Sequence, residues 1–334
     1  MKRALVVGAG GFIGGHLCRK LHKEGYRVHG VDIKAPEFCP KEGLGCEKFF
    51  TMDMAIPYNW TFIFQMHKYD EIYQLAADMG GAGFIFTGEH DVEVMINSAR
   101  INIALCKTLT ENRELIPDLK VFYSSSACVY PQENQKDNEF PHTAEHSAYP
   151  ANPDSEYGWE KLFSERLYFA MNRNYGLNIR VCRFHNVFGP YGTYTGGREK
   201  APAALCRKIA SLPPEGGTID IWGDGEQTRS FIYIDEALEA IRRFMNANFH
   251  GPLNIGSSEM VTINELVGMI TLISGKNVNL HHIGGPIGVR GRNSDNRLIQ
   301  EKLGWAPSRP LFAGLQKTYK WIEECINAEK TKEK

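Results

Sequence analysis

Tyr157 and Lys161 are the residues whose types and spacing most directly indicate chemistry. If residues 155–175 form a helix, the two side chains lie on the same face, one turn apart. An isolated tyrosine loses its proton near pH ~10, but a fixed positive charge nearby favours the phenolate and lowers its pKa. Tyr157 is therefore a candidate general base, and Ser126 could share a hydrogen bond between its phenol and a substrate hydroxyl.

The pattern of a serine followed by Tyr-x-x-x-Lys resembles that of the short-chain dehydrogenase/reductase family. A tyrosine and a lysine four residues apart are also common on the solvated face of a helix, so the pattern alone is weak evidence. Its meaning depends on the other motifs of the chain and on the elements that would position them.

Length and composition bound the possible functions. The chain has 334 residues, of which 43% are hydrophobic and 23% charged, enough for a sizeable core and two lobes. The formal net charge of -1 gives no overall attraction to nucleic acid or to an anionic membrane. The N-terminus runs directly into a short apolar strand, without a secretory segment or a membrane span, which predicts a soluble cytoplasmic protein.

The cysteines and histidines show no metal-binding pattern. The eight cysteines contain no Cys-x-x-Cys pair and no zinc spacing, which favours a reducing compartment. His281 and His282 have no carboxylate or cysteine at ligand spacing, so we expect them on a strand and predict no metal site. Cys128 is the one cysteine that lies next to a candidate catalytic residue in the sequence, since it follows Ser126 by two positions.

A glycine-rich turn near the N-terminus predicts the cofactor. A β-rich run at residues 4–7 leads into Gly8-Ala9-Gly10-Gly11-Phe12-Ile13-Gly14, and apolar residues then recur at helical spacing. Strand, glycine turn and helix form a dinucleotide site, because the glycines let the backbone approach a pyrophosphate whose charge the helix N-terminus favours. Gly8, Gly11 and Gly14 fit the G-x-x-G-x-x-G variant of the extended short-chain dehydrogenases, with Phe12 and Ile13 inside the turn. A tight turn without a ligand is the alternative.

Two aspartates follow the next predicted strands. The strand at 27–31 ends at Asp32, whose carboxylate can accept both ribose hydroxyls of NAD and would repel the 2′-phosphate of NADP. Lys34 works against that preference. The strand at 48–52 ends at Asp53, which by position could contact the adenine or could simply cap the following turn. We therefore predict NAD as the cofactor.

The alternation of strands and helices predicts the fold. A further strand, with the small-residue turn after it, is expected at 71–77, and others at 121–124 and 179–184, with helices at 93–113 and 155–175. This order favours an α/β fold with a Rossmann-type, doubly wound parallel sheet. We assign residues 1–187, rejoined by about 231–250, to an NAD-binding domain, and residues 188–334 mainly to a smaller C-terminal substrate-binding lobe.

Three loops in the second half carry basic residues, in a chain with almost no net charge. They span residues 189–202, 223–230 and 284–293, with a strand expected at 219–222. Together they resemble a clamp for a diphosphate. Each arginine or lysine taken singly could instead be an ordinary surface charge.

A closer resemblance emerges from the whole set of motifs. The segments that carry it are residues 76–81, 125–131, 183–186, 196–204, 222–230 and 288–296. They are similar in order and type to those of the GDP-mannose 3,5-epimerase family. A generic nucleotide-sugar epimerase would have Thr or Ser in place of Cys128 and would lack the block at 196–202. The resemblance implies NAD-dependent conversion of GDP-D-mannose to GDP-L-galactose, and to its relative GDP-L-gulose, without net redox change.

The residues are suited to such chemistry. A hydrogen on a sugar ring carbon is not acidic enough for a side-chain base, but a ketone at carbon 4 makes both neighbouring carbons α to a carbonyl. Tyr157, with Lys161 and Ser126, would take the hydroxyl proton at carbon 4 while NAD takes the hydride. The resemblance implies that Cys128 then removes a proton and that Lys200 returns one from the opposite ring face. For Cys128, the alternative is a small buried hydrophobe.

The resemblance also implies the substrate contacts. They are Gly80, Ser126, Ala127, Cys128, Asn186, Glu199, Lys200, Ala201, Lys208, Gln227, Thr228, Arg229 and Arg292. By their charge, Lys208 and Arg292 are expected on the phosphates. Asn186 and Gln227 could instead be ordinary turn and loop residues.

Other functions stay open at this point. One alternative is a 4-epimerase or 4,6-dehydratase of the same family, and another is a catalytically silent NAD-binding protein. Related enzymes pair the helices corresponding to 93–113 and 155–175 in a four-helix bundle between two protomers, so the resemblance implies a homodimer.

Overall fold

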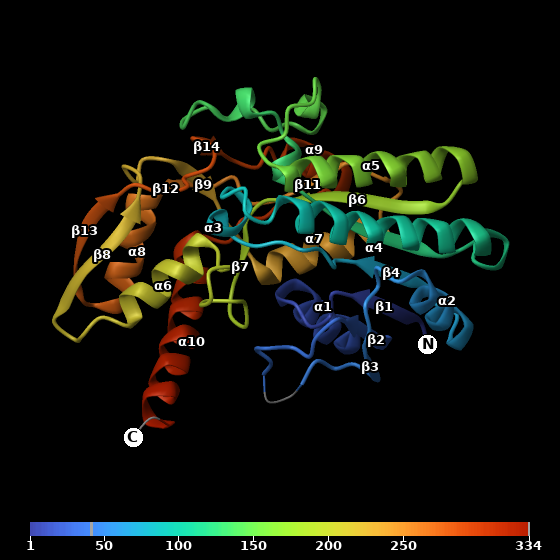
Figure 1. Ribbon diagram of the computed structural model, residues 1–334, viewed down its shortest axis with the longest axis horizontal. Helices are drawn as coiled ribbons and strands as arrows, with labels where there is room; N and C mark the ends of the chain where they lie inside the picture. The colour runs from blue at the N-terminus through green and yellow to red at the C-terminus, as the bar shows by residue number, and fades with distance from the viewer. Residues whose placement is uncertain (41–42, 333–334) are drawn as a thin grey trace.

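The computed structural model describes residues 1–40 and 43–332 and has a seven-stranded parallel sheet at its centre (Figure 1). In spatial order the strands are β3 (Lys48–Thr51), β2 (Arg27–Asp32), β1 (Arg3–Val7), β4 (Glu71–Gln74), β5 (Lys120–Ser126), β6 (Asn178–Phe184) and β11 (Leu253–Ile255). The strand order changes direction between β1 and β4, and ligands of open α/β sheets bind at such a point, outside the carboxyl ends of the strands. The predicted doubly wound parallel sheet is confirmed.

Helices cover both faces of this sheet. α1 (Phe12–Lys23) and α7 (Ile234–Asn246) pack together in one layer, whereas α2 (Pro57–Met66), α4 (Asp91–Asn112) and α5 (Glu156–Tyr175) form the other. Successive residues of β1 alternate between the layers, because side chains of a strand point to opposite faces. Val6 belongs to the core under α1, and Leu5 belongs to the core under α2 and α4.

A smaller lobe stands beside the central sheet, at the left of Figure 1. It contains α6 (Ala201–Ala210), α8 (Ile263–Ser274), the parallel pair β8 (Gly216–Trp222) and β13 (Asn277–Ile283), and the small sheet of β12 (Met260–Thr262), β9 (Thr228–Ser230) and β14 (Gly291–Arg292). α10 (Leu311–Lys332) packs against α6 and α8. The shorter elements are α3 (Ala82–Ile85), α9 (Arg297–Leu303), β7 (Val187–Phe188) and β10 (Ile232–Tyr233).

Two elements from the second half of the chain belong to the larger part. α7 packs on α1, and β11 is the edge strand beside β6. The predicted boundary between residues 187 and 188 stays a prediction. Within residues 1–40 and 43–332, no helix combines the length and apolar character needed to cross a membrane.

α5 is the helix that carries Tyr157 and Lys161, and local sequence explains its limits. The Ser155 hydroxyl accepts a hydrogen bond from the Gly158 backbone N–H at 3.2 Å, which caps the N-terminus. Gly176 ends the helix in the left-handed conformation, at φ 64°. The predicted helices at 155–175 and 93–113 are confirmed as α5 and α4, with small differences at their ends.

Candidate active site

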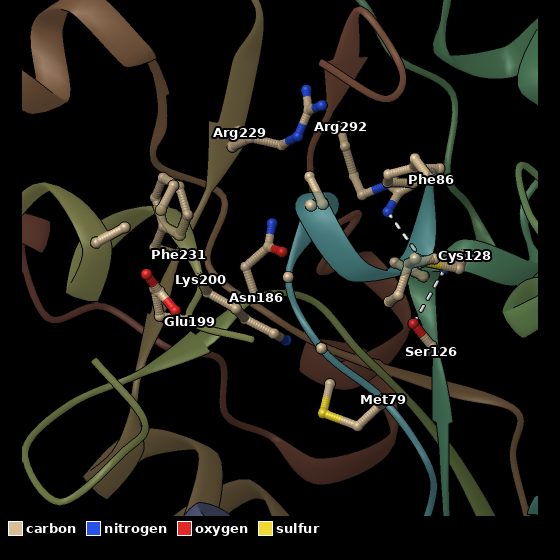
Figure 2. Close-up of a pocket in the computed structure, with 18 of the residues that line it drawn as sticks. Met79, Phe86, Ser126, Cys128, Asn186, Glu199, Lys200, Arg229, Phe231 and Arg292 are labelled. Carbon is tan, nitrogen blue, oxygen red and sulfur yellow. Dashed lines mark hydrogen bonds between the residues drawn. The ribbon is translucent and has the colours of Figure 1, made fainter. Parts of the chain in front are cut away.

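A cavity of about 440 Å³ lies between the carboxyl edge of the sheet and the smaller lobe (Figure 2). It collects most of the residues predicted to touch substrate or perform chemistry. Those that line it are Ile13, Gly80, Ser126, Ala127, Cys128, Tyr157, Lys161, Asn186, Glu199, Lys200, Ala201, Lys208, Gln227, Arg229 and Arg292. The other predicted residues lie outside its lining: Gly8, Gly11, Phe12, Gly14, Asp32, Asp53 and Thr228.

Cys128 lies in a single 3-10 turn, Ala127–Val129, directly after β5. Its backbone N–H donates to the Ser126 hydroxyl at 3.2 Å, and its sulfur accepts a hydrogen bond from Arg292 Nη1 at 3.3 Å (Figure 2). The first turn of α5 packs directly on its carbonyl group, since a Cβ on Gly158 would lie 2.2 Å from that oxygen. Burial raises the pKa of the Cys128 thiol, as does the Asp154 carboxylate, whereas the guanidinium of Arg292 lowers it.

Tyr157 and Lys161 are buried, with exposures of 7% and 1%. Lys161 Nζ donates to the Ser124 carbonyl at 3.0 Å and lies 5.5 Å from the centre of the Tyr157 ring. Burial raises the pKa of Tyr157, and the hydrogen bond with Ser126 lowers it by less. The expected lowering of this pKa is therefore wrong for the protein without ligands, because burial raises the pKa by more than the Ser126 hydrogen bond lowers it.

Lys200 enters the cavity from the smaller lobe, at the N-terminus of α6. Figure 2 shows its amino group reaching from that lobe towards the side that carries Cys128. Burial lowers the pKa of Lys200, whereas Cys128 raises it. Burial thus favours the uncharged forms of both Lys200 and Cys128.

Arg229 is a half-buried cation whose hydrogen bonds go to main-chain carbonyls. It donates to Thr228 O at 2.7 Å, Ile287 O at 2.9 Å and Val289 O at 2.6 Å. Loss of water and, to a smaller extent, the charge of Arg292 together lower its pKa to about 9. Lys208, expected on the phosphates, donates from Nζ to the Asp220 carbonyl at 2.6 Å.

Arg292, also expected on the phosphates, instead directs its donors at side chains around Cys128. Nε donates to Gln135 Oε1 at 2.6 Å, and Nη2 is ion-paired with Asp154. Sequence reasoning did not identify Gln135 or Asp154. The only signal was the position of Asp154 in Pro153-Asp154-Ser155, which resembles an ordinary helix start.

Two further lining residues have features that suit ligand contact. Asn186 adopts φ 25°, uncommon for a residue other than glycine, and donates from Nδ2 to the Ser230 carbonyl at 3.0 Å. Gln227 donates to the Trp222 carbonyl at 3.1 Å, while its Oε1 is buried and has no hydrogen-bond partner among the described residues. Buried acceptors are normally paired, so this oxygen is available to a ligand donor.

Glu199 and Thr228 are held by contacts inside the protein. Glu199 accepts from the Gly197 N–H at 2.7 Å and pairs with Arg207 at 3.1 Å. Thr228 donates from its hydroxyl to the Asn138 carbonyl at 2.5 Å. Their direct contact with substrate stays a prediction.

The glycine turn has the shape of a dinucleotide cradle. A Cβ on Gly14 would lie 2.0 Å from the Gly8 carbonyl oxygen, and Gly8 itself adopts φ +88°. Gly11 is the N-cap of α1 and has no side chain to cap the helix, which leaves the first N–H groups of α1 for an anion. Asp32 accepts from the Gly10 N–H at 2.9 Å. Asp53 accepts from the Ala55 N–H at 2.8 Å, the contact expected of a residue that caps a turn.

Comparisons with known proteins show the family of the chain. A model of the NAD dependent epimerase/dehydratase family matches residues 4–256. GDP-mannose 3,5-epimerase of Arabidopsis thaliana is 44% identical over 327 residues, which are 98% of this chain and 84% of that protein. GDP-mannose 3,5-epimerase 1 of Oryza sativa subsp. indica is 44% identical over 329 residues, with the same coverage. The solved structure of Thermotoga maritima UDP-glucose 4-epimerase with UDP-glucose has a TM-score of 0.81 at 25% identity, covering 97% of this chain and 99% of that one.

The cradle yields a test of cofactor binding. Gly14→Ala forces a Cβ against the Gly8 carbonyl, so we expect NAD affinity to fall by roughly tenfold or more. Calorimetric titration with NAD, together with quantification of nucleotide released on denaturation, measures this. Gly268→Ala is the matched control, because its Cβ meets open space in α8 and should leave NAD affinity unchanged. Equal affinity in both variants would contradict the placement of the cofactor.

Proposed function

The chain belongs to the NAD dependent epimerase/dehydratase family, and we propose that it epimerises GDP-D-mannose at carbons 3 and 5. The products are GDP-L-galactose and, by inversion at carbon 5 alone, GDP-L-gulose. Such an enzyme is an isomerase, because the sugar is rearranged without net oxidation. The observation that carries the proposal is that Cys128 and Lys200 share one cavity with Ser126, Tyr157 and Lys161.

The residues around the glycine turn fit NAD, since Gly8 and Gly14 have no room for a Cβ and the N-cap of α1 makes no side-chain hydrogen bond within the described residues. Gly8, Gly11 and Gly14, with the backbone of Phe12 and Ile13, would hold the pyrophosphate. Asp32 would hold the adenosine ribose, Asp53 the adenine, and Tyr157 and Lys161 the nicotinamide end. When bound, NAD accepts a hydride from carbon 4 of the sugar and returns it to the same carbon.

Tyr157 takes the proton of the carbon 4 hydroxyl and later gives it back. Burial holds this proton on the phenol, so the residues beside it must favour the phenolate. The Ser126 hydroxyl does so by hydrogen bonding. The Lys161 ammonium, 5.5 Å from the centre of the ring, would do so by its charge. The resulting ketone makes carbons 3 and 5 acidic enough for side-chain bases.

Cys128 and Lys200 then move protons at these two carbons. They come from different parts of the fold, the turn after β5 and the N-terminus of α6, so a sugar ring between them would present opposite faces. Cys128 removes the proton and Lys200 returns one. Free thiols and amines have pKa values of ~8.5 and ~10.4, and burial shifts the two towards each other, which eases transfer in either direction.

The diphosphate is assigned to Arg229 and Lys208. The hydrogen bonds of Arg229 go to main-chain carbonyls, and no carboxylate of the described residues pairs with its guanidinium. This positive charge is therefore suited to a phosphate. The free Oε1 of Gln227 and the strained Asn186 supply further polar contacts. The predicted set of substrate contacts is completed by Gly80, Ala127, Glu199, Ala201 and Thr228. Arg292 is buried and acts on the site through its hydrogen bond to the sulfur of Cys128.

A 4-epimerase or a 4,6-dehydratase is the second candidate. Its catalysis needs the tyrosine, the lysine and the serine, which this cavity has. A 4-epimerase has no task for an acid and a base on opposite faces of the ring. Cys128 and Lys200 therefore favour the 3,5-epimerase over a 4-epimerase and over a silent NAD-binding protein.

Solvent exchange tests the proposed reaction. Incubation of the protein with GDP-mannose in deuterium oxide should remove the proton NMR signals at carbons 3 and 5 and produce galactose- and gulose-type resonances. A 4-epimerase would incorporate no deuterium, and a 4,6-dehydratase would leave carbon 3 untouched. Bound NAD without any exchange would indicate the silent binder.

The acid and base roles predict a separation of catalysis from cofactor binding. Cys128→Ala and Lys200→Ala should each lower epimerisation by roughly 100-fold or more, because each removes a group that transfers protons. NAD content should stay at the wild-type level. Cys206→Ala, which removes a buried thiol outside the cavity lining, is the control and should retain activity. Loss of NAD from Cys128→Ala or Lys200→Ala would mean that their roles are structural.

We also propose a homodimer formed through α4 and α5. Both helices expose large apolar side chains: Ile96 and Ile103 on α4 are 50% and 49% exposed, and Trp159 and Phe163 on α5 are 40% and 49% exposed. α4 and α5 pack side by side, so these residues extend over adjacent helices. Such surfaces mark protein interfaces.

The dimer can be tested by placing a charge in this surface. Phe163→Glu should shift the protein from dimer to monomer in analytical ultracentrifugation, because a buried unpaired carboxylate is costly. Leu272→Glu, at a 74% exposed position on α8, should leave the dimer intact. A wild-type protein that sediments only as a monomer at micromolar concentration would refute the proposal.

We place the protein in the cytoplasm, since its eight cysteines are all free thiols. The net charge of -1 gives no overall attraction to nucleic acid or membranes, so a small nucleotide sugar is the proposed partner.

A further inference from the structure

Arg292 lies against the sulfur of Cys128 and is fixed there by two other side chains. It is 6% exposed and sits on the short strand β14. Nη1 donates to Cys128 Sγ at 3.3 Å, Nε donates to Gln135 Oε1 at 2.6 Å, and Nη2 pairs with Asp154 Oδ2. Each nitrogen of the guanidinium thus has its own acceptor, and its plane has a defined orientation.

The two acceptors are themselves held in place. Gln135 is fully buried and donates from Nε2 to the carbonyls of Tyr130 and Pro131, at 3.0 and 3.3 Å. Its Oε1 must therefore face Arg292. The Asp154 side chain is 2% exposed and accepts at Oδ1 from the Ser155 hydroxyl at 2.8 Å.

Asp154 is also tied to the backbone of the cysteine. Its N–H donates to the Cys128 carbonyl at 3.4 Å, and Gly158, in the following turn, packs on the same carbonyl oxygen. The carboxylate, the guanidinium and the thiol therefore form one connected unit at the start of α5.

We propose that Asp154 and Gln135 are positioning residues, which hold the guanidinium of Arg292 against the sulfur of Cys128 so that this thiol can serve as a base. The inference rests on the proposed role of Cys128 and deepens it. In this assignment, Arg292 stabilises the thiolate of Cys128, and Arg229 is the arginine that binds the phosphates.

The charged groups around Cys128 show why this placement matters. Its surroundings contain Tyr157 and Lys161 on α5, Lys200 at the start of α6, Arg229 on β9, Arg292 on β14 and Asp154 before α5. Of these, Arg292 is the one with a hydrogen bond to the sulfur in the part of the chain that is described. Burial raises the pKa of the thiol, so a correctly aimed cation is needed to stabilise the thiolate.

Substitution of the two positioning residues should shift the pKa of the Cys128 thiol in opposite directions. Asp154 carries a negative charge that disfavours a thiolate, so its loss with retained geometry lowers the pKa of Cys128. Gln135 is neutral and acts only by orientation, so its loss releases Arg292 and raises that pKa. A purely structural role would not give opposite signs.

The experiment is alkylation of Cys128 by iodoacetamide over a range of pH, followed by mass spectrometry of its peptide. Only the thiolate reacts, so the midpoint of the rate profile reports the pKa. Asp154→Asn keeps an acceptor for Nη2 and should lower the midpoint by about one pH unit, or raise the rate about tenfold below the midpoint. Gln135→Leu should raise the midpoint and slow alkylation at the same pH.

Two more variants make the outcome decisive. Glu156→Gln removes a carboxylate next to Tyr157 that has no bond to Arg292, and should leave the midpoint unchanged. Arg292→Lys keeps the charge but cannot reach three acceptors, so it should raise the midpoint as Gln135→Leu does. NAD content and far-ultraviolet circular dichroism verify folding of each variant.

The proposal is overturned if Asp154→Asn and Gln135→Leu shift the midpoint in the same direction, or if neither differs from Glu156→Gln. The measurement needs no substrate. A different nucleotide sugar would therefore leave this result intact, and a negative result here would leave the solvent-exchange test unaffected.

Discussion

Exclusion of water from the reacting groups is the constraint on which the rest of this site depends. Burial disfavours a charged thiolate, phenolate or ammonium, and in this cavity it shifts the pKa of Cys128, Tyr157 and Lys200 towards their neutral forms. Each ion that catalysis needs must therefore be stabilised by an arranged partner. Lys161 has the Ser124 carbonyl, and Cys128 has Arg292. Burial makes these few contacts strong, and it makes their loss costly.

The buried groups of the cavity come from two parts of the fold, the central sheet and the smaller lobe. α5 packs closely on the turn that follows β5, because the missing side chain of Gly158 lets the helix approach the Cys128 carbonyl. Lys200 comes from the other lobe, so the distance between the proposed acid and base depends on how the lobes meet. Two loops join them over the cavity: the Gly81 N–H donates to the Arg198 carbonyl at 3.0 Å, and the Arg198 side chain pairs with Asp78 at 2.8 Å.

Sequence patterns predicted the elements and motifs that depend on neighbours in the chain. Periodicity indicated the strands and helices of the central sheet, and the glycine turn indicated the cradle at Gly8 and Gly14. The three-residue strand β11 was missed, because so short a segment has no periodicity. The raised pKa of Tyr157 and the place of Arg292 were also missed. Both follow from burial and from partners such as Gln135, 157 residues away from Arg292 in the chain.

In the proposed mechanism, transient oxidation at carbon 4 makes the proton transfers by Cys128 and Lys200 possible. The decisive experiment uses GDP-mannose that carries deuterium at carbon 4, incubated with the enzyme in ordinary water. We expect slower turnover and full retention of the label at carbon 4 in substrate and products alike, because the hydride returns to the carbon from which it came. Release of the label to solvent, with epimerisation still proceeding, would contradict this mechanism.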